Sequence, residues 1–184
     1  MIRGVMVLTA TGALLATGTA ADGRVQGAVD PAVFQAKVLA RAEKWFRAGL
    51  NYSQDHCWSE QTGYSQANWG GPLGGCSWPA YRTDCSGFVS MAWGVWSSYA
   101  TPRPGPSPDL DNISHVITED ELRTGDILVA DSKHVRLFER WVDRTARRYL
   151  AYDFGSTPVK HQEYVLDAPG ENRYRTLRSN QVAT

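Results

Sequence analysis

Few residues in this chain of 184 can perform covalent chemistry, and Cys85 is the clearest candidate among its three cysteines. Apolar residues follow it at helical spacing, at Phe88, Val89, Ala92 and Trp96. This pattern predicts a helix that begins at or near Cys85, with Asp84 as its N-cap. A thiol at a helix start meets unpaired N–H groups and the positive end of the helix dipole, which favour the nucleophilic thiolate. A buried structural cysteine is the alternative that this context leaves open.

Two segments of the chain resemble those of a known enzyme family. Residues 84–89, Asp-Cys-Ser-Gly-Phe-Val, resemble the nucleophile motif of the NlpC-type cell-wall cysteine peptidases. Residues 122–128 and 134–138, which include Gly-Asp-Ile-Leu and His-Val, resemble the histidine motif of the same family. The resemblance covers about residues 40–178. It implies a papain-like fold and hydrolysis of the peptide stems of bacterial peptidoglycan.

A cysteine nucleophile needs a general base, for which histidine is the usual residue. His134 follows a turn at the entry of an expected strand, and it matches the histidine of the family motif. We therefore expect His134 to act on Cys85. The other three histidines are expected to be structural or solvated: His56, His115 and His161.

A third polar residue usually orients such a histidine. The resemblance places it on the strand after the histidine strand, often as a second histidine, but residues 148–154 contain none. Asp153 is our first choice because a carboxylate accepts a hydrogen bond and offsets the imidazolium charge. Tyr152, on the opposite face of the strand, is the second choice. A dyad without a third member remains a further alternative.

The resemblance also implies residues that receive the substrate. In the family, the aspartate before the nucleophile and a tyrosine after the first helix bind the free amine of a short peptide stem. Asp84 and Tyr52 match these positions, and Ser86 is assigned to substrate binding with them. A plain N-cap is the alternative role of Asp84.

The odd number of cysteines predicts one disulfide and one free thiol in a secreted protein. Cys57 and Cys76 flank an irregular glycine-rich loop, so we expect them to pair and Cys85 to stay free. The two other pairings remain alternatives. A zinc site built on His56 and Cys57 lacks a second close pair of ligands, so no metal is expected. The sequence contains no nucleotide-binding motif of the required form, and no cofactor is expected.

Residues 1–20 read as a secretory signal peptide, with basic Arg3, a short apolar run and small residues at the end. Residues 21–184 then form one catalytic domain, expected to be secreted and to act at the bacterial cell wall as a monomer. The apolar run is too short to span a bilayer, so no stable membrane insertion is expected. The net charge of zero gives no support for binding to nucleic acid.

The elements that position these residues suggest an α+β fold. A helix is expected from Asp30-Pro31 to Gly49, with a stripe of apolar residues at Phe34, Val38, Ala42, Trp45 and Phe46. A long irregular loop over 51–82 and a proline-rich loop over 101–111 are expected to border the substrate cleft. The expected strands are 127–130, 135–138, 148–154, 159–165 and 174–178. This order predicts a papain-like antiparallel sheet or partial barrel with the nucleophile helix packed on it.

The function expected from these features is cysteine-peptidase cleavage of peptidoglycan stem peptides. The resemblance implies the bond between D-glutamate and a diamino acid as the common target. An N-acetylmuramoyl-L-alanine amidase or a wall-linked acyltransferase is the alternative among enzymes. A non-catalytic wall-binding module is the alternative from another class.

Overall fold

The computed structural model describes residues 29–71, 73–105 and 108–182. Within these residues the chain forms two α-helices, α1 (Pro31–Ala48) and α2 (Cys85–Trp93), and two antiparallel sheets. The α+β class is therefore confirmed. The expected signal peptide, residues 1–20, lies outside the described residues.

The first helix, α1, has the ends that the sequence predicts. The Asp30 carboxylate accepts hydrogen bonds from the N–H groups of Ala32 and Val33, at 2.9 and 3.2 Å. Gly49 ends the helix with a left-handed φ of 61°. Four residues of the predicted stripe are buried, but Phe46 is 37% exposed. Its ring packs edge-on against Tyr152 at the margin of the core, so the stripe is narrower than predicted.

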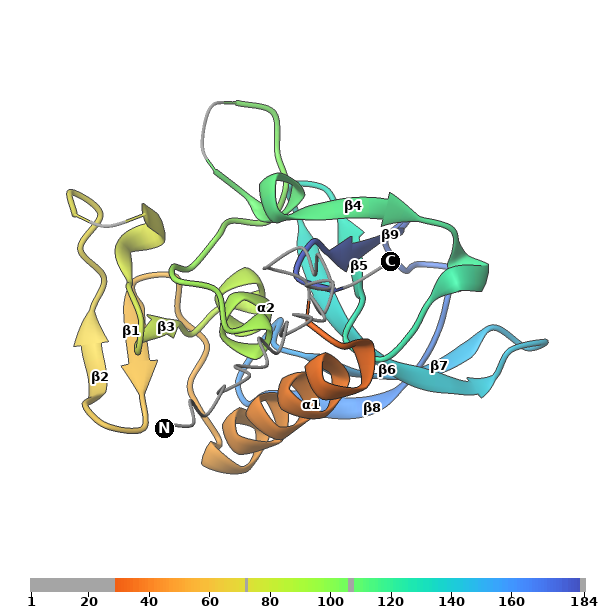
Figure 1. The fold of residues 1–184 in the computed structure, drawn as a ribbon, viewed down its shortest axis with the longest axis horizontal. Coiled ribbons are helices and arrows are strands. Elements are labelled where there is room, and N and C mark those ends of the chain that lie inside the picture. The colour runs from red at the N-terminus through yellow and green to blue at the C-terminus, as the bar shows by residue number, and fades with distance from the viewer. Residues whose placement is uncertain (1–28, 72, 106–107, 183–184) are drawn as a thin grey trace, which may run out of the picture.

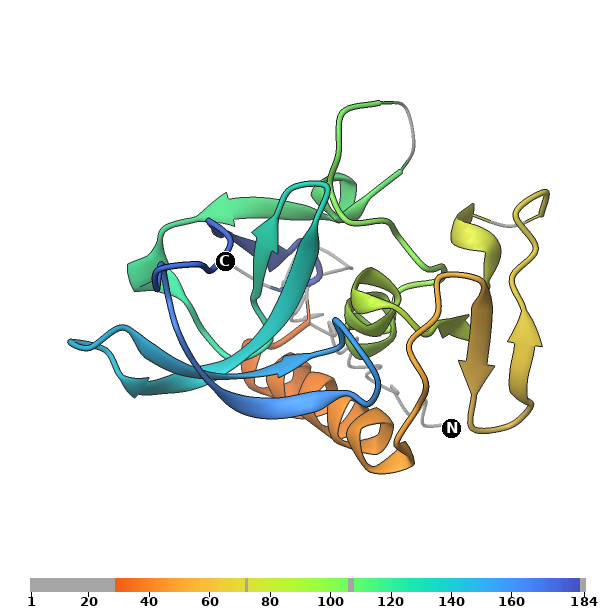
Figure 2. The same ribbon diagram turned by 180° about the vertical axis from the view of Figure 1, so that it is seen from behind.

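The second helix, α2, begins at Cys85 as predicted, and Asp84 caps it by accepting a 2.7 Å hydrogen bond from the N–H of Gly87. It ends earlier than the apolar spacing predicted, because Gly94 adopts a left-handed φ of 68°. Trp96 therefore lies outside the helix and is 70% exposed. All nine helical residues are buried, since α2 lies between the two sheets and contacts α1, β3 and β6 (Figures 1 and 2).

The smaller sheet is a correction to the predicted irregular loop over 51–82. It has the order β2-β1-β3 and consists of β1 (His56–Ser59), β2 (Gly63–Gln66) and β3 (Tyr81–Arg82). These strands have two to four residues each, and β2 has no buried residue. Strands this short and polar carry too little alternation of apolar residues to stand out in the sequence.

The larger sheet has the order β4-β9-β5-β6-β7-β8. Its strands are β4 (Ser114–Ile117), β5 (Ile127–Ala130), β6 (His134–Asp143), β7 (Arg148–Asp153), β8 (Lys160–Val165) and β9 (Arg175–Ser179). Five were predicted, and the hairpin of β5 and β6 is confirmed, although β6 runs five residues longer than expected, to Asp143. The edge strand β4 was not predicted, because its four residues Ser-His-Val-Ile include only two apolar side chains.

Both faces of the larger sheet carry a hydrophobic core, which explains why every residue of β5 is buried. Ile127 and Val129 face the helices, whereas Leu128 and Ala130 belong to a second core with Leu166. Within the part of the chain that the structure describes, no helix has the length and apolarity needed to cross a bilayer.

Candidate active site

Cys85 opens onto a cavity of about 340 Å³ while only 6% of its surface is exposed. Two walls enclose this cleft. Residues before α2 form one wall, and the proline-rich loop together with the turn between β5 and β6 forms the other. The hydroxyl of Thr101 lies 3.6 Å from the Cys85 sulfur. The lining residues are Gln54, Trp69, Gly74, Arg82, Asp84, Cys85, Ser86, Ala100, Thr101, Arg103, Pro108, Ser132 and Lys133. The expected border by both loops is thus observed, with Gln54 to Gly74 on one side and Ala100 to Pro108 on the other.

His134 is the first residue of β6 and is mostly buried. Burial by itself disfavours the imidazolium. The hydrogen bond and charge of Asp153, followed by the interaction with Cys85, outweigh this effect and raise the pKa of His134 to about 9. The Nε2 atom lies 2.9 Å from Oδ1 of Asp153, which leaves Nδ1 for the cysteine. With this pKa, the imidazole of His134 is protonated at neutral pH.

Asp153, the last residue of β7, is a buried carboxylate with four hydrogen bonds. Its Oδ1 accepts from Nε2 of His134 at 2.9 Å and from the N–H of Gly155 at 2.8 Å. Its Oδ2 accepts from Nε of Arg136 at 2.8 Å and from the hydroxyl of Tyr164 at 2.9 Å. Burial alone would raise the pKa of Asp153, but His134 and Arg136 hold it well below its usual range.

Arg136 supports Asp153 from the side away from His134. Its guanidinium lies 3.7 Å from the centre of the Tyr164 ring and 3.0 Å from the carboxylate of Glu171. It also donates a 3.1 Å hydrogen bond to the hydroxyl of Tyr149. Because Arg136 faces Asp153 across the β6–β7 ladder, the strand register itself sets this ion pair. In the sequence, the only signal for Arg136 is its place two residues after His134.

Gly155 is a further residue that sequence reasoning missed. A Cβ atom at this position would lie 2.9 Å from Cε1 of His134 and 3.1 Å from Oδ1 of Asp153. Arg136 pairs with Asp153, so the same register extended by two residues brings position 155 opposite His134. Because glycine has no side chain, the imidazole of His134 can lie over the backbone at position 155. A glycine just beyond the strand that carries the orienting residue is the signal that could have identified it.

Tyr152, the second choice for the orienting residue, directs its hydroxyl to a residue other than His134. It donates a 2.9 Å hydrogen bond to Glu43 of α1, and its ring stacks on His161 with the ring centres 4.1 Å apart. Alternation along β7 places Tyr152 on the face opposite Asp153. Of the two candidates, the structure brings Asp153 to His134.

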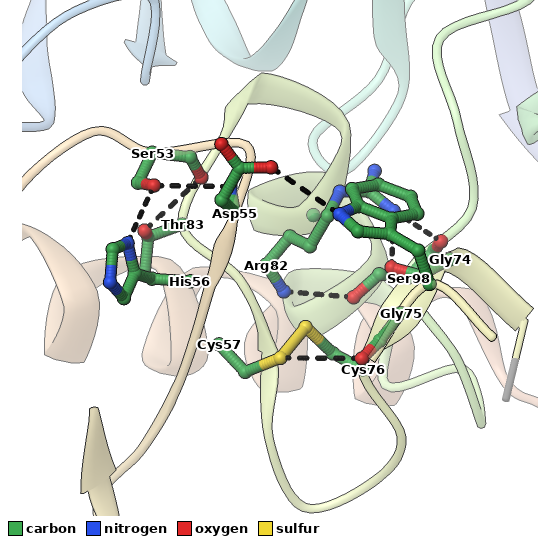
Figure 3. Close-up of a disulfide and its surroundings, with 12 residues drawn as sticks. Ser53, Asp55, His56, Cys57, Gly74, Gly75, Cys76, Arg82, Thr83 and Ser98 are labelled. Atoms are coloured by element: carbon green, nitrogen blue, oxygen red, sulfur yellow. Dashed lines mark hydrogen bonds between the residues drawn. A yellow bond between two sulfur atoms is a disulfide. The ribbon is translucent and has the colours of Figure 1, made fainter. Parts of the chain in front are cut away.

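Asp84 is held by an arginine that sequence reasoning did not select. Nε of Arg82 lies 2.9 Å from Oδ2 of Asp84, and both side chains are buried. Arg82 also donates to the carbonyl oxygens of Gly74 and Ser98 at 2.7 and 2.9 Å (Figure 3). It donates to the hydroxyl of Ser86 at 3.0 Å. The charge of Asp84 is thereby offset within the protein, which favours its capping role. Its recognition of an amine stays a prediction.

Tyr52 lies near the candidate site, although it does not line the cleft. Its ring packs edge-on against Phe154. Burial, followed by the negative charges of Cys85 and Asp84, raises the pKa of Tyr52. Gln54, rather than Tyr52, reaches the cavity wall.

The other three histidines have partners of their own. His56 bonds to Ser53 at 2.8 Å, His115 to Asn180 at 2.9 Å and His161 to Glu139 at 2.6 Å. Among the described residues, no three His, Cys, Asp or Glu side chains gather as metal ligands would.

The predicted disulfide is confirmed. Cys57 and Cys76 are bonded, which joins β1 to the segment before β3 (Figure 3). Cys85 is a free thiol. The bridged segment carries Gly75, whose carbonyl oxygen lies beside the bridge, and Gly74, which accepts from Arg82. The disulfide therefore braces one wall of the cleft. Such a bond is typical of proteins from an oxidising environment.

Comparison with known proteins gave no relative of this chain: no family model, no curated protein and no solved structure matched it.

Proposed function

We propose that this protein is a secreted, papain-like cysteine peptidase that hydrolyses amide bonds in the stem peptides of bacterial peptidoglycan. The supporting observation is the order of three side chains. Cys85 stands at the start of α2 and lines the cavity, the residues directly before His134 line the same cavity, and Asp153 holds Nε2 of His134 at 2.9 Å. A structural cysteine has no need of a buried, charge-supported histidine beside a cavity.

The papain-like assignment rests on the layout of these elements. The proposed nucleophile begins a buried helix, the proposed base begins a strand of an antiparallel sheet, and the helix packs against that strand. The sequence resemblance to the NlpC-type peptidases points to the same layout. It also supplies the proposed substrate and the D-glutamyl–diamino acid bond as the target.

The proposed reaction passes through an acyl-enzyme. The Cys85 thiolate attacks the scissile carbonyl carbon and forms a carbon–sulfur bond. His134, charged at neutral pH, gives its proton to the leaving amine as the carbon–nitrogen bond breaks. The neutral imidazole then takes a proton from water as the water oxygen attacks the thioester carbon, and the carbon–sulfur bond breaks to release the carboxylic acid and restore the thiolate and the imidazolium. Asp153 keeps the imidazole oriented and balances its charge through both steps.

The start of α2 offers the groups that would stabilise the oxyanion. The first N–H groups of a helix have no acceptor within the helix, and the Asp84 side chain takes that of Gly87 only. The N–H groups of Cys85 and Ser86 are thus the proposed donors to the tetrahedral intermediate. The helix dipole adds to their effect.

The compartment follows from the disulfide and the expected leader. A Cys57–Cys76 bridge favours an oxidising environment, and a cell-wall peptidase has to work outside the cytoplasm. We propose that the protein acts there as a monomer and without a metal or organic cofactor.

Digestion of purified muropeptides, followed by mass spectrometry, tests this function. A peptidase yields severed stems, an N-acetylmuramoyl-L-alanine amidase yields glycan free of peptide, and an acyltransferase yields products joined to an added amine. A binding module yields unchanged muropeptides.

The Cys85→Ala variant is the matched control for this digestion. It removes only the sulfur and leaves Asp84, Gly87 and the helix cap in place. We expect no severed stems from the variant. Retention of wild-type cleavage by Cys85→Ala would overturn the proposed function.

A further inference from the structure

The two walls of the cleft differ in charge. Asp84 is the only carboxylate among the residues that line the cavity, and Arg82 neutralises it at 2.9 Å. Two more cations, Arg103 and Lys133, line the cavity on the opposite wall. Lys133 therefore gives a positive charge to the wall built by the proline-rich loop and the β5–β6 turn, and the described residues of this wall contribute no carboxylate to the lining.

Carboxylates near this wall are already bound to other groups. Asp131 begins the turn before Lys133, but its carboxylate lies 2.7 and 3.0 Å from guanidinium nitrogens of Arg175. Asp109 accepts hydrogen bonds from the backbone N–H groups of Arg103 and Asp111. Among the described residues, no carboxylate forms an ion pair with the ammonium group of Lys133.

The backbone that carries Lys133 is fixed in place. Ser132 adopts a left-handed φ of 60°, which is uncommon for a residue with a side chain. Its N–H donates a 2.7 Å hydrogen bond to the carbonyl oxygen of Pro102, and the N–H of Lys133 donates a 2.9 Å bond to that of Ala130. The turn and the proline-rich loop are thus joined into one wall, beside both His134 and Thr101.

We propose that this wall is a carboxylate-binding subsite in which Lys133 supplies the ammonium group. A substrate with a free carboxylate close to the scissile amide would be bound in preference to its carboxamide counterpart. An ammonium group at the cavity edge is hydrated while no substrate is bound. Its pairing with a carboxylate therefore has a modest desolvation cost. The substrate class rests on the proposed peptidase function, whereas the anion site itself does not.

Alkylation of Cys85 tests the anion site without any need for catalysis. Iodoacetate and iodoacetamide form the same bond to the thiolate with loss of iodide, but only iodoacetate is negatively charged. Cys57 and Cys76 are disulfide-bonded, so Cys85 is the thiol that reacts. The quantity to measure is the ratio of the two alkylation rates at low salt.

We expect Lys133→Met to lower the iodoacetate-to-iodoacetamide ratio by roughly three- to tenfold, and Lys133→Glu to lower it further. Salt should reduce the wild-type ratio toward that of Lys133→Met. Lys37→Met is the matched control, because Lys37 is an exposed lysine of α1 outside the cleft. An unchanged ratio in Lys133→Met would overturn the subsite.

A pair of stem peptides that differ only in a carboxylate or a carboxamide beside the scissile bond tests the substrate class. The wild-type protein should cleave the carboxylate peptide with the higher kcat/KM, and Lys133→Met should cleave both alike. Equal cleavage by the wild-type protein would overturn the preference and leave the peptidase function intact. If neither peptide is cleaved while the alkylation ratio still depends on Lys133, the proposed function fails and the anion site stands.

Discussion

The Asp153 carboxylate contacts several neighbours at once in the candidate site. It is buried, it contacts His134 and Arg136 on opposite sides, and Tyr164 and Gly155 complete its four hydrogen bonds. Such a carboxylate fixes the imidazole and offsets its positive charge. A series of contacts thus runs from Glu171 to Arg136, from Arg136 to Asp153 and from Asp153 to His134, and the proposed catalytic cysteine depends on it.

Asp153→Asn tests this dependence. The amide of asparagine brings no charge, so we expect kcat to fall by roughly 10²- to 10⁴-fold while KM changes little. Tyr152→Phe is the matched control on the same strand and should retain most activity, since its hydroxyl contacts Glu43 instead. Stem-peptide cleavage measures both, and circular dichroism checks that Asp153→Asn still folds. Full activity in Asp153→Asn, with loss in Tyr152→Phe, would exclude Asp153 as the orienting residue.

The pH dependence of activity follows from the protonation of His134. Its pKa is raised to about 9, so the imidazolium that protonates the leaving amine persists through neutral pH. We expect kcat/KM to decline as the pH rises through about 9. Removal of the Asp153 charge lowers the pKa of His134, so this decline should move to lower pH in Asp153→Asn. A pH–rate profile of the two proteins measures the shift, and identical alkaline limbs would contradict it.

Gly155→Ala tests whether the imidazole needs the space above position 155. The added Cβ would lie 2.9 Å from Cε1 of His134, a separation too short for two carbon atoms. The ring has to move, and a displacement of about 1 Å can lower the rate by roughly 10²-fold. Gly70→Ala is the control, because a Cβ there meets only Oδ1 of Asn68 at 3.7 Å. Peptide cleavage by both variants gives the comparison, in which equal rates would rule out the steric requirement.

The packing of α2 explains why a glycine, Gly87, lies two residues after the proposed nucleophile Cys85. A Cβ at Gly87 would lie 2.1 Å from the carbonyl oxygen of Arg82, so the helix packs directly on β3 at this point. The same contact keeps Arg82 beside Asp84, which caps the helix. The start of α2 and the end of β3 are thus one packed unit that sets the direction of Cys85.

The disulfide stabilises the wall on this side of the cleft. Cys57 and Cys76 are 19 residues apart, and closing such a loop contributes about 3 kcal/mol in the chain-entropy account. We expect the double variant Cys57→Ala/Cys76→Ala to lose about this much free energy of unfolding in urea. Reduction of the wild-type protein should produce a similar loss. A decrease below about 1 kcal/mol in both experiments would show that the rest of the fold already holds this segment.

The elements that the sequence predicts well are those with strong local signals. Asp30-Pro31 and Gly49 mark the ends of α1, Asp84 marks the start of α2, and the apolar run 127–130 is β5. The small sheet and β4 escaped prediction because their short strands gain stability from pairing with distant partners. The contributions of Arg82, Arg136 and Gly155 depend on register and close packing, which only the folded chain brings together. The expected contact between His134 and Asp153 is present, the catalytic roles of Cys85, His134 and Asp153 stay predictions, and Tyr52 lies beside the cleft rather than in its lining.

At the scale of the whole molecule, the His134–Asp153 pair links stability to pH. The folded pKa of His134, about 9, exceeds its usual value of 6.5, so the pair stabilises fully below about pH 6.5 and loses this effect as the pH rises to about 9. Urea unfolding of the wild-type protein and His134→Gln should show a difference that shrinks by on the order of 1–3 kcal/mol between pH 6 and pH 9.5. A difference that stays constant over this range would show that the imidazolium adds nothing to stability.

The position of Cys85 has one more consequence, which concerns when the protein becomes active. Cys85 belongs to a helix that contacts both sheets, whereas His134 and Asp153 belong to the larger sheet alone (Figure 1). No local segment of the chain contains both the nucleophile and the base, so their alignment depends on docking of the helix onto β6. A chain that has formed its helices and strands without docking them holds every proposed catalytic group but does not align them, so the proposed hydrolysis requires the contact between α2 and β6.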